Sequence, residues 1–169
     1  MKSMIVYSSK TGNTKKVAEA IFDVMPMGTD IFAVEDAPLP DGYDFIVLGF
    51  WVKRENADQK AQGYMGTIKG KKVALFATLG AEPDSSHAQK SMLNAKKLLD
   101  SDNKIMGEFI CRGKIDPKVT ESLMKLAADN PHAMTQERLA HHKASSNHPN
   151  MEDLQNARKA FKEILRRKN

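Results

Sequence analysis

The chain has 169 residues, of which 41% are hydrophobic and 28% charged, and 26 basic against 21 acidic residues give a formal net charge of +5. This length suits one domain with a substantial core, and no apolar run approaches the ~20 residues that a transmembrane helix needs. Because the basic excess is mild, we expect no nucleic-acid partner. A single cysteine excludes an internal disulfide framework, and we therefore expect a cytoplasmic protein with no membrane association.

The first half of the chain predicts three strands and one helix. The apolar stretch MIVYS, residues 4–8, is predicted to be the first strand, and no signal peptide is visible before it. Apolar residues at helical spacing then predict a helix over residues 13–25. Further strands are predicted at TDIFAVE, residues 29–35, and at DFIVLGF, residues 44–50, on either side of a loop rich in Pro, Gly and Asp.

The second half continues the alternation. A fourth strand is predicted within residues 69–80, ending at Gly80, followed by a helix over 86–102, a fifth strand over 104–113 and a final helix over 151–169. The polar stretch between the last two elements predicts a helical insertion at about 115–150. We therefore expect a single domain over residues 1–169.

Continuous apolar strands joined by helices predict a parallel sheet with helices on both faces, which is a doubly wound, three-layer α/β sandwich. In such sheets ligands bind beyond the carboxyl ends of the strands, where the winding direction reverses. With five parallel strands in the order 2-1-3-4-5, the loops after strands one, three and four meet at one crevice.

The loop after the first strand, SSKTGNT, combines small hydroxyl residues with a glycine. The free N–H groups and the dipole of a helix N-terminus stabilise a phosphate. Gly12 lets the backbone approach the phosphate closely, Ser9, Thr11 and Thr14 supply hydroxyl donors, and Lys10 supplies one cation. The spacing matches neither a P-loop nor a dinucleotide-binding turn. The alternative is a helix cap alone, with Thr11 or Asn13 as the capping residue.

The other two loops each carry a feature suited to a flat ligand. Trp51, in GFWVKREN, is the only tryptophan and can either stack on a planar ring or cover the edge of the core. In ATLGAEPDSSH the small residues Thr78, Gly80 and Ala81 would let a flat ligand lie against the backbone. The alternative for this loop is an ordinary connection with a Pro-Asp turn.

The stretch IVYSSKTGNTKKVAEAI resembles the N-terminal signature of the flavodoxin family, with Tyr7, Ser9, Gly12, Thr14, Ala18 and Ile21 in register. The resemblance implies a flavodoxin-like fold that binds FMN. It implies that the first loop holds the phosphate, that the other two loops flank the isoalloxazine ring, and that Trp51 stacks on it. The implied cofactor-binding residues are Ser9, Lys10, Thr11, Gly12, Asn13, Thr14, Phe50, Trp51, Val52, Lys53, Thr78, Leu79, Gly80 and Ala81.

The chain also departs from the family pattern. Flavodoxins that carry single electrons are usually acidic, and this chain is basic. They usually have a glycine beside the flavin, where this chain has the β-branched Val52. Lys53 and Arg54 would favour the anionic reduced flavin if they lie near it, or they form a solvated pair in the loop.

We therefore expect an FMN-binding electron-transfer protein that passes electrons to or from a redox partner protein, as a monomer or weak homodimer, with no catalytic residue of its own. The alternative is an FMN-dependent NAD(P)H oxidoreductase, similar to quinone reductases, that acts on a small acceptor. A third hypothesis is a scaffold of the same fold without redox function. The five histidines have no spacing typical of a metal site, so we expect no bound metal.

Overall fold

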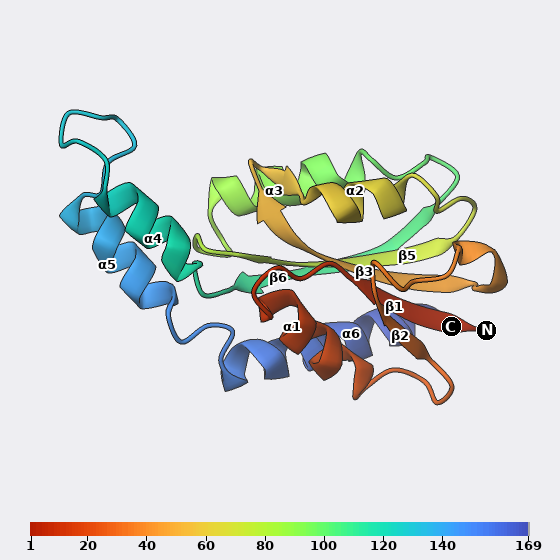
Figure 1. Ribbon diagram of the computed structural model, residues 1–169. Helices are drawn as coiled ribbons and strands as arrows, with labels where there is room; N and C mark the ends of the chain where they lie inside the picture. The colour runs from red at the N-terminus through yellow and green to blue at the C-terminus, as the bar shows by residue number, and fades with distance from the viewer. Residues whose placement is uncertain (169) are drawn as a thin grey trace.

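In the computed structural model, which describes residues 1–168, a parallel five-stranded sheet forms the centre of the molecule (Figure 1). The strands are β1 (Ser3–Tyr7), β2 (Asp30–Ala33), β3 (Phe45–Lys53), β5 (Lys72–Leu79) and β6 (Lys104–Arg112). Their spatial order is β2-β1-β3-β5-β6, which confirms the predicted order 2-1-3-4-5. A sixth strand, β4 (Asn56–Ala57), pairs antiparallel with the end of β3, and the sequence analysis does not predict it.

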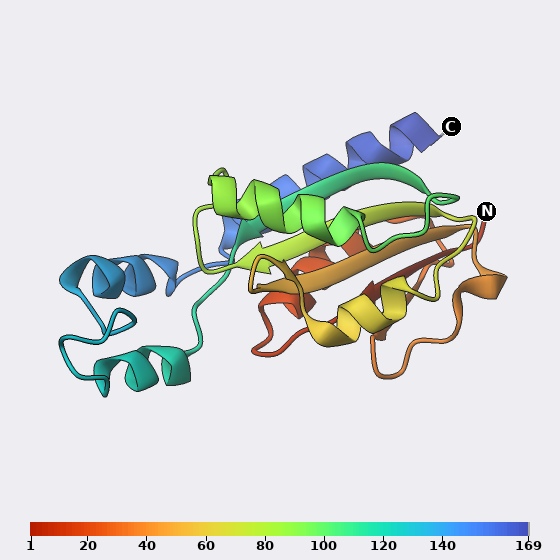
Figure 2. The same cartoon turned by 90° about the horizontal axis from the view of Figure 1, so that it is seen from above.

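Helices cover both faces of the sheet, as Figures 1 and 2 show. One face carries α1 (Asn13–Phe22) and α6 (Met151–Lys168). The other face carries α2 (Gln59–Met65) and α3 (Ser86–Lys96), and a short 3₁₀ turn, η1 (Pro40–Gly42), precedes β3. This arrangement confirms the predicted three-layer α/β sandwich.

Alternate residues of the central strands pack on opposite faces of the sheet, because successive strand side chains point to opposite sides. Ile46 and Leu48 lie in the core beneath α2 and α3, whereas Val47 lies in the core beneath α1 and α6. In this second core the ring of Phe76 meets that of Phe161 edge to face, with 6.3 Å between centroids. Gly49 continues β3 beneath the Phe76 ring, which occupies the space that a side chain at position 49 would need.

Two further helices, α4 (Pro117–Met124) and α5 (Gln136–Ser145), lie in the range predicted to be a helical insertion. We call residues 113–148 the arm. Figures 1 and 2 show it projecting beyond the end of the sheet at which β6 ends. Its two ends are joined by hydrogen bonds, from the Lys114 N–H to the His148 carbonyl oxygen at 2.7 Å and from the Ile115 N–H to Ser145 Oγ at 3.1 Å.

Several predicted boundaries are wrong. The helix predicted to reach Met25 ends at Phe22, because Pro26 disfavours helical backbone in the residue before it. The helix predicted over 86–102 ends at Lys96, and the turn after it is held by the Asn103 side-chain amide, which donates to the carbonyl oxygens of Ile68 and Asp100. The last residue of the predicted final helix, Asn169, lies outside the described residues.

Helix α2, like β4, is not predicted from the sequence. It is seven residues long and contains Gly63, so it carries little helical pattern. The Asp58 carboxylate begins it by accepting hydrogen bonds from the N–H groups of Lys60 and Ala61 at 3.2 and 3.3 Å. Over residues 1–168 no helix combines the length and the hydropathy that a membrane crossing requires.

Cys111, the single cysteine, is expected to be unreactive in the folded protein. It is 3% exposed near the end of β6, and burial is the main cause that raises the pKa of its thiol. Because the thiolate is the reactive form, we expect a thiol reagent at pH 8 to modify the native protein at least ~100-fold more slowly than the urea-unfolded chain. Similar rates in both states would contradict this burial.

Candidate functional site

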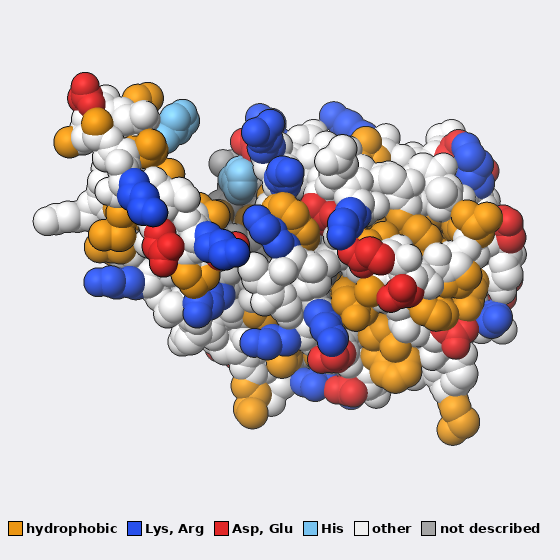
Figure 3. All heavy atoms as spheres, in the orientation of Figure 1, with side chains coloured by type: hydrophobic (Ala, Val, Ile, Leu, Met, Phe, Trp, Pro, Cys, Tyr) orange, Lys and Arg blue, Asp and Glu red, His pale blue; other side chains and the backbone are white. Residues whose placement is uncertain are grey.

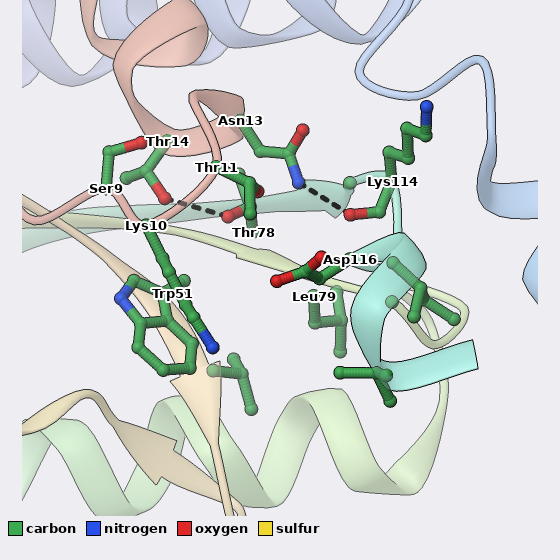
Figure 4. A pocket seen from close by; sticks show the side chains of 15 residues that line it. Ser9, Lys10, Thr11, Asn13, Thr14, Trp51, Thr78, Leu79, Lys114 and Asp116 are labelled. Atoms are coloured by element: carbon green, nitrogen blue, oxygen red, sulfur yellow. Dashed lines mark hydrogen bonds between the residues drawn. The ribbon is translucent and has the colours of Figure 1, made fainter. Parts of the chain in front are cut away.

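The carboxyl ends of β1, β3 and β5 open into a pocket of about 180 Å³, which the base of the arm completes (Figure 4). Three segments that are far apart in the sequence thus meet here, as expected at the winding reversal of a doubly wound sheet. The lining residues are Ser9, Lys10, Thr11, Asn13, Thr14, Trp51, Val52, Thr78, Leu79, Gly80, Gly113, Lys114, Ile115, Asp116 and Val119.

The first wall of the pocket is the start of α1. Gly12 is the N-cap residue of the helix, with φ of 95° and no capping side chain of its own, so the hypothesis that Thr11 or Asn13 is the capping residue is wrong. Ser9 Oγ instead accepts hydrogen bonds from the N–H groups of Gly12 and Lys15, at 3.2 and 3.3 Å. Among residues 1–168 the N–H groups of Asn13 and Thr14 have no acceptor. Free donors of this kind, at the positive end of the helix dipole, are suited to an anion.

Two hydrogen bonds fix this wall to its neighbours (Figure 4). The hydroxyl groups of Thr14 and Thr78, each residue 1% exposed, lie 2.9 Å apart and join α1 to the end of β5. The Asn13 side-chain amide donates to the Lys114 carbonyl oxygen at 2.9 Å and joins α1 to the base of the arm. The start of α1 is therefore held by the sheet on one side and by the arm on the other.

The second wall is Trp51, which belongs to a strand. The prediction that Phe50–Lys53 form a loop is wrong, because β3 continues to Lys53 and pairs there with β4. Strand alternation then buries Phe50 fully in the core beneath α2 and α3, and half-buries Trp51 against the pocket. Two ammonium groups approach the indole, with Lys10 Nζ at 5.5 Å and Lys53 Nζ at 5.9 Å from a ring centroid.

The turn between β3 and β4 lies beside this wall and is strained. Arg54 and Glu55 have φ of 49° and 59°, a conformation that side chains with a Cβ rarely adopt. The Glu55 carboxylate pairs with Lys90 Nζ at 2.7 Å, which lowers its pKa, and its carbonyl oxygen accepts from the Asn94 amide at 2.8 Å. Contacts with α3 thus hold the turn in place.

We expect Arg54→Gly to stabilise the protein by about 0.5–1 kcal/mol, because glycine adopts positive φ without a steric penalty. The neighbouring substitution Lys53→Gly is the matched control. It removes the same charge from an extended strand position and is expected to destabilise by roughly 0.5–1 kcal/mol. Urea denaturation measures both, and a loss of stability in Arg54→Gly would show that the turn is not strained.

The structure brings most of the predicted site residues into this one pocket, but not all of them. Phe50 lies in the core, and Gly12 and Ala81 are not among the lining residues. Lys53 lines a neighbouring hollow that it shares with Ser9, Lys10 and Trp51.

Residues at the base of the arm are those that the sequence analysis missed. Gly113, Lys114, Ile115, Asp116 and Val119 follow the last strand, whose carboxyl end lies at the same edge of the sheet. The sequence signal was the GKIDP stretch, which begins where that strand ends. The base of the arm packs closely against the end of β5, since a Cβ on Gly80 would lie 2.5 Å from Ile115 Cγ1.

The charged residues at the pocket favour an anionic ligand. The lining includes two lysines, Lys10 and Lys114, and one acidic residue, Asp116. Asp116 Oδ1 already accepts a hydrogen bond from the Lys118 N–H at 3.0 Å, at the start of α4. Figure 3 shows Lys and Arg side chains gathered where the arm meets the sandwich. In the part of the chain that the structure describes, no cluster of His, Cys, Asp or Glu is suited to a metal ion.

Comparison with known proteins gives consistent results. A family model described as a flavodoxin domain matches residues 4–162. The flavodoxin-like domain-containing protein BilS of Clostridioides difficile is 34% identical, over 98% of this chain and 97% of that protein. An uncharacterized protein of Methanocaldococcus jannaschii is 28% identical, over 98% of this chain and 99% of that protein.

Two solved structures share the fold at low sequence identity. A flavodoxin of Streptococcus pneumoniae superposes with a TM-score of 0.61 at 11% identity, over 98% of this chain and 99% of that one. A flavoprotein of Lactobacillus acidophilus, solved in complex with FMN, superposes with a TM-score of 0.53 at 15% identity, over 72% of this chain and 97% of that one.

Proposed function

Because this chain belongs to the flavodoxin family, we propose that it binds FMN in the strand-end pocket and passes electrons to or from a redox partner protein. The observation that carries the proposal is the start of α1, where the N–H groups of Asn13 and Thr14 are free and which shares one pocket with Trp51. A free set of phosphate donors and an aromatic surface are the two features that a ring-bearing monophosphate requires.

The residues at the start of α1 fit the phosphate end of FMN. The N–H groups of Asn13 and Thr14 are free in the described structure, and the Thr11 hydroxyl makes no hydrogen bond to a described residue. Gly12 has a positive φ, and beyond its chain neighbours no heavy atom lies within 4 Å of where its Cβ would be, so the backbone there is accessible. Lys10 supplies a cation beside these neutral donors.

The residues beyond the phosphate donors fit the flavin ring. Trp51 offers an aromatic face, and Leu79, at the end of β5, offers an apolar side chain across the pocket from it (Figure 4). When bound, FMN supplies the redox chemistry, and the protein supplies binding and electrostatics. The ammonium groups of Lys10 and Lys53 beside Trp51 stabilise negative charge on a group stacked there. This stabilisation of negative charge favours reduction of the bound group. No side chain is assigned a proton transfer.

A second candidate function is an NAD(P)H oxidoreductase that acts on a small acceptor. The observation in its favour is that Ile115 and Val119 of the arm line the pocket, which gives the site an apolar wall that an electron carrier does not need. An enzyme of this kind binds its nucleotide and its acceptor beside the flavin, whereas a carrier exchanges electrons with a docked protein.

The test is a spectrum of the purified protein after incubation with FMN, followed by anaerobic reduction. We expect one FMN per chain with a perturbed flavin absorbance, and no bleaching by NADPH or NADH until a partner reductase is added. A protein that takes up no FMN would contradict the proposal. Rapid bleaching by the nucleotide alone would favour the oxidoreductase. In the same proposal the protein is cytoplasmic. It is also a monomer or weak homodimer, and size-exclusion chromatography measures this oligomeric state.

A further inference from the structure

Arg112, the last residue of β6, is buried although it carries a permanent charge. The residue is 6% exposed, and burying a guanidinium is unfavourable unless its donors are satisfied. Here Nε donates to the Gly80 carbonyl oxygen at 3.2 Å and Nη1 to Glu82 Oε1 at 2.5 Å. Nη2 contacts His141 twice, donating to its carbonyl oxygen at 3.0 Å and lying 3.2 Å from its Nδ1.

These contacts join the loop after β5 to the arm. Gly80 and Glu82 belong to the loop after β5, and Gly80 lines the pocket. His141 belongs to α5, the second helix of the arm. The guanidinium therefore fixes the outer helix of the arm to the loop that forms one wall of the pocket.

The inner end of the arm is already attached to the pocket by other contacts. Ile115 packs against Gly80, and its N–H donates to Ser145 Oγ at the end of α5. Thr120 in α4 lies within hydrogen-bonding distance of His142 in α5, with 2.7 Å between Oγ1 and Nδ1. Because the two arm helices are joined to each other, a contact that holds α5 also holds α4, whose Val119 faces the pocket.

We propose that Arg112 is a positioning residue that holds the arm against the strand-end pocket and so sets how long FMN stays bound. The inference rests on the proposed function, since it assumes that FMN occupies the pocket. Arg112 itself is not among the lining residues, so it acts through the loop at Gly80–Glu82 and through α5. Loss of its contacts increases the population in which the arm stands away from the pocket.

The first measurement is the rate of FMN dissociation from the full chain, followed by the recovery of flavin fluorescence. Arg112→Gln is expected to accelerate dissociation by about 10- to 100-fold, because hydrogen bonds from a charged group are among the stronger ones. Arg112→Lys keeps the charge with fewer donors and is expected to restore part of the loss. Arg158→Gln is the matched control, since Arg158 also pairs with a carboxylate, that of Asp23, but outside the pocket lining. We expect it to leave the rate unchanged.

The second measurement is amide hydrogen exchange of the protein without FMN. Arg112→Gln should accelerate exchange in α5 and leave the central strands β1 and β3 unchanged. This exchange measurement does not require FMN and tests by itself whether Arg112 holds the arm. A wild-type protein that fails to bind FMN would contradict the proposed function, and the two failures can therefore be told apart. If Arg112→Gln does not fold, Glu82→Gln removes the anionic partner of the same network, and we expect about 3- to 10-fold faster dissociation.

A purely structural role for Arg112 predicts a different result. Arg112→Gln would then lower the thermal midpoint but leave both the FMN dissociation rate and the exchange of α5 at wild-type values, and that outcome would overturn the proposal. Faster exchange in α5 with an unchanged dissociation rate would also overturn it, because the arm would then not control the retention of FMN.

Discussion

Thr11→Glu is expected to weaken FMN binding by about 100-fold or more, whereas Thr11→Gln weakens it by less than about tenfold. The Thr11 side chain lines the pocket beside the free N–H groups of Asn13 and Thr14. Both substitutions remove the hydroxyl and add a side chain of nearly the same size, so they differ mainly in charge. A carboxylate here lies close to the phosphate, and two anions at such a distance repel strongly where water is partly excluded.

Equilibrium titration of each variant with FMN, followed by flavin fluorescence, gives the two dissociation constants. Riboflavin, which lacks the phosphate, provides the control, and its affinity should differ little between Thr11→Glu and Thr11→Gln. Equal FMN affinities of the two variants would show that the phosphate does not bind at the start of α1. A large difference for riboflavin would instead show that the glutamate disturbs the ring end of the pocket.

Gly49→Ala is expected to destabilise the fold by roughly 3 kcal/mol, the largest effect on stability that we expect from one methyl group. The added Cβ would lie 1.9 Å from Phe76 Cζ. The ring cannot simply move aside, because it packs against Phe161 on its outer side. Gly49 also belongs to β3, between β1 and β5, so a shift of the backbone would disturb both neighbouring strands.

The control for this prediction is Gly63→Ala, the same chemical change in the interior of α2. No heavy atom lies within 4 Å of the added Cβ there, and alanine is a better helix former than glycine, so we expect a gain of about 0.5–1 kcal/mol. Urea denaturation followed by circular dichroism measures both variants. A loss below about 1 kcal/mol in Gly49→Ala would mean that the Phe76 ring has a second position available to it.

The parallel sheet and the position of the pocket could be predicted from the sequence because both depend on simple patterns. Continuous apolar strands specify a parallel sheet, and the site of such a sheet lies at the carboxyl ends of its strands. Thr14 and Thr78 are 64 residues apart, yet each follows from its own strand-end loop, and the structure places their hydroxyl groups 2.9 Å apart. Local sequence thus identified both residues without information on their contact.

The features that were missed depend on pairing and on tertiary contact. Phe50 and Trp51 are adjacent aromatic residues. Phe50 faces the core and Trp51 the pocket because β3 continues through the segment that was expected to be a loop. That extension requires β4, a strand of two residues that is too short to leave a pattern. The base of the arm was missed for the same reason, because Ile115 and Val119 have no periodic signal that places them beside Gly80.

The position of α6 has a consequence for the order in which the protein can form during synthesis. Its Phe161 and Ile164 complete the core that α1 begins on one face of the sheet, yet the whole arm separates them from β6. While residues 1–112 emerge from the ribosome, α2 and α3 can already cover the opposite face. The α1 face, including the Phe76 ring, keeps apolar surface exposed until residues 151–168 arrive, and in that interval the nascent chain is most exposed to aggregation and to chaperone binding.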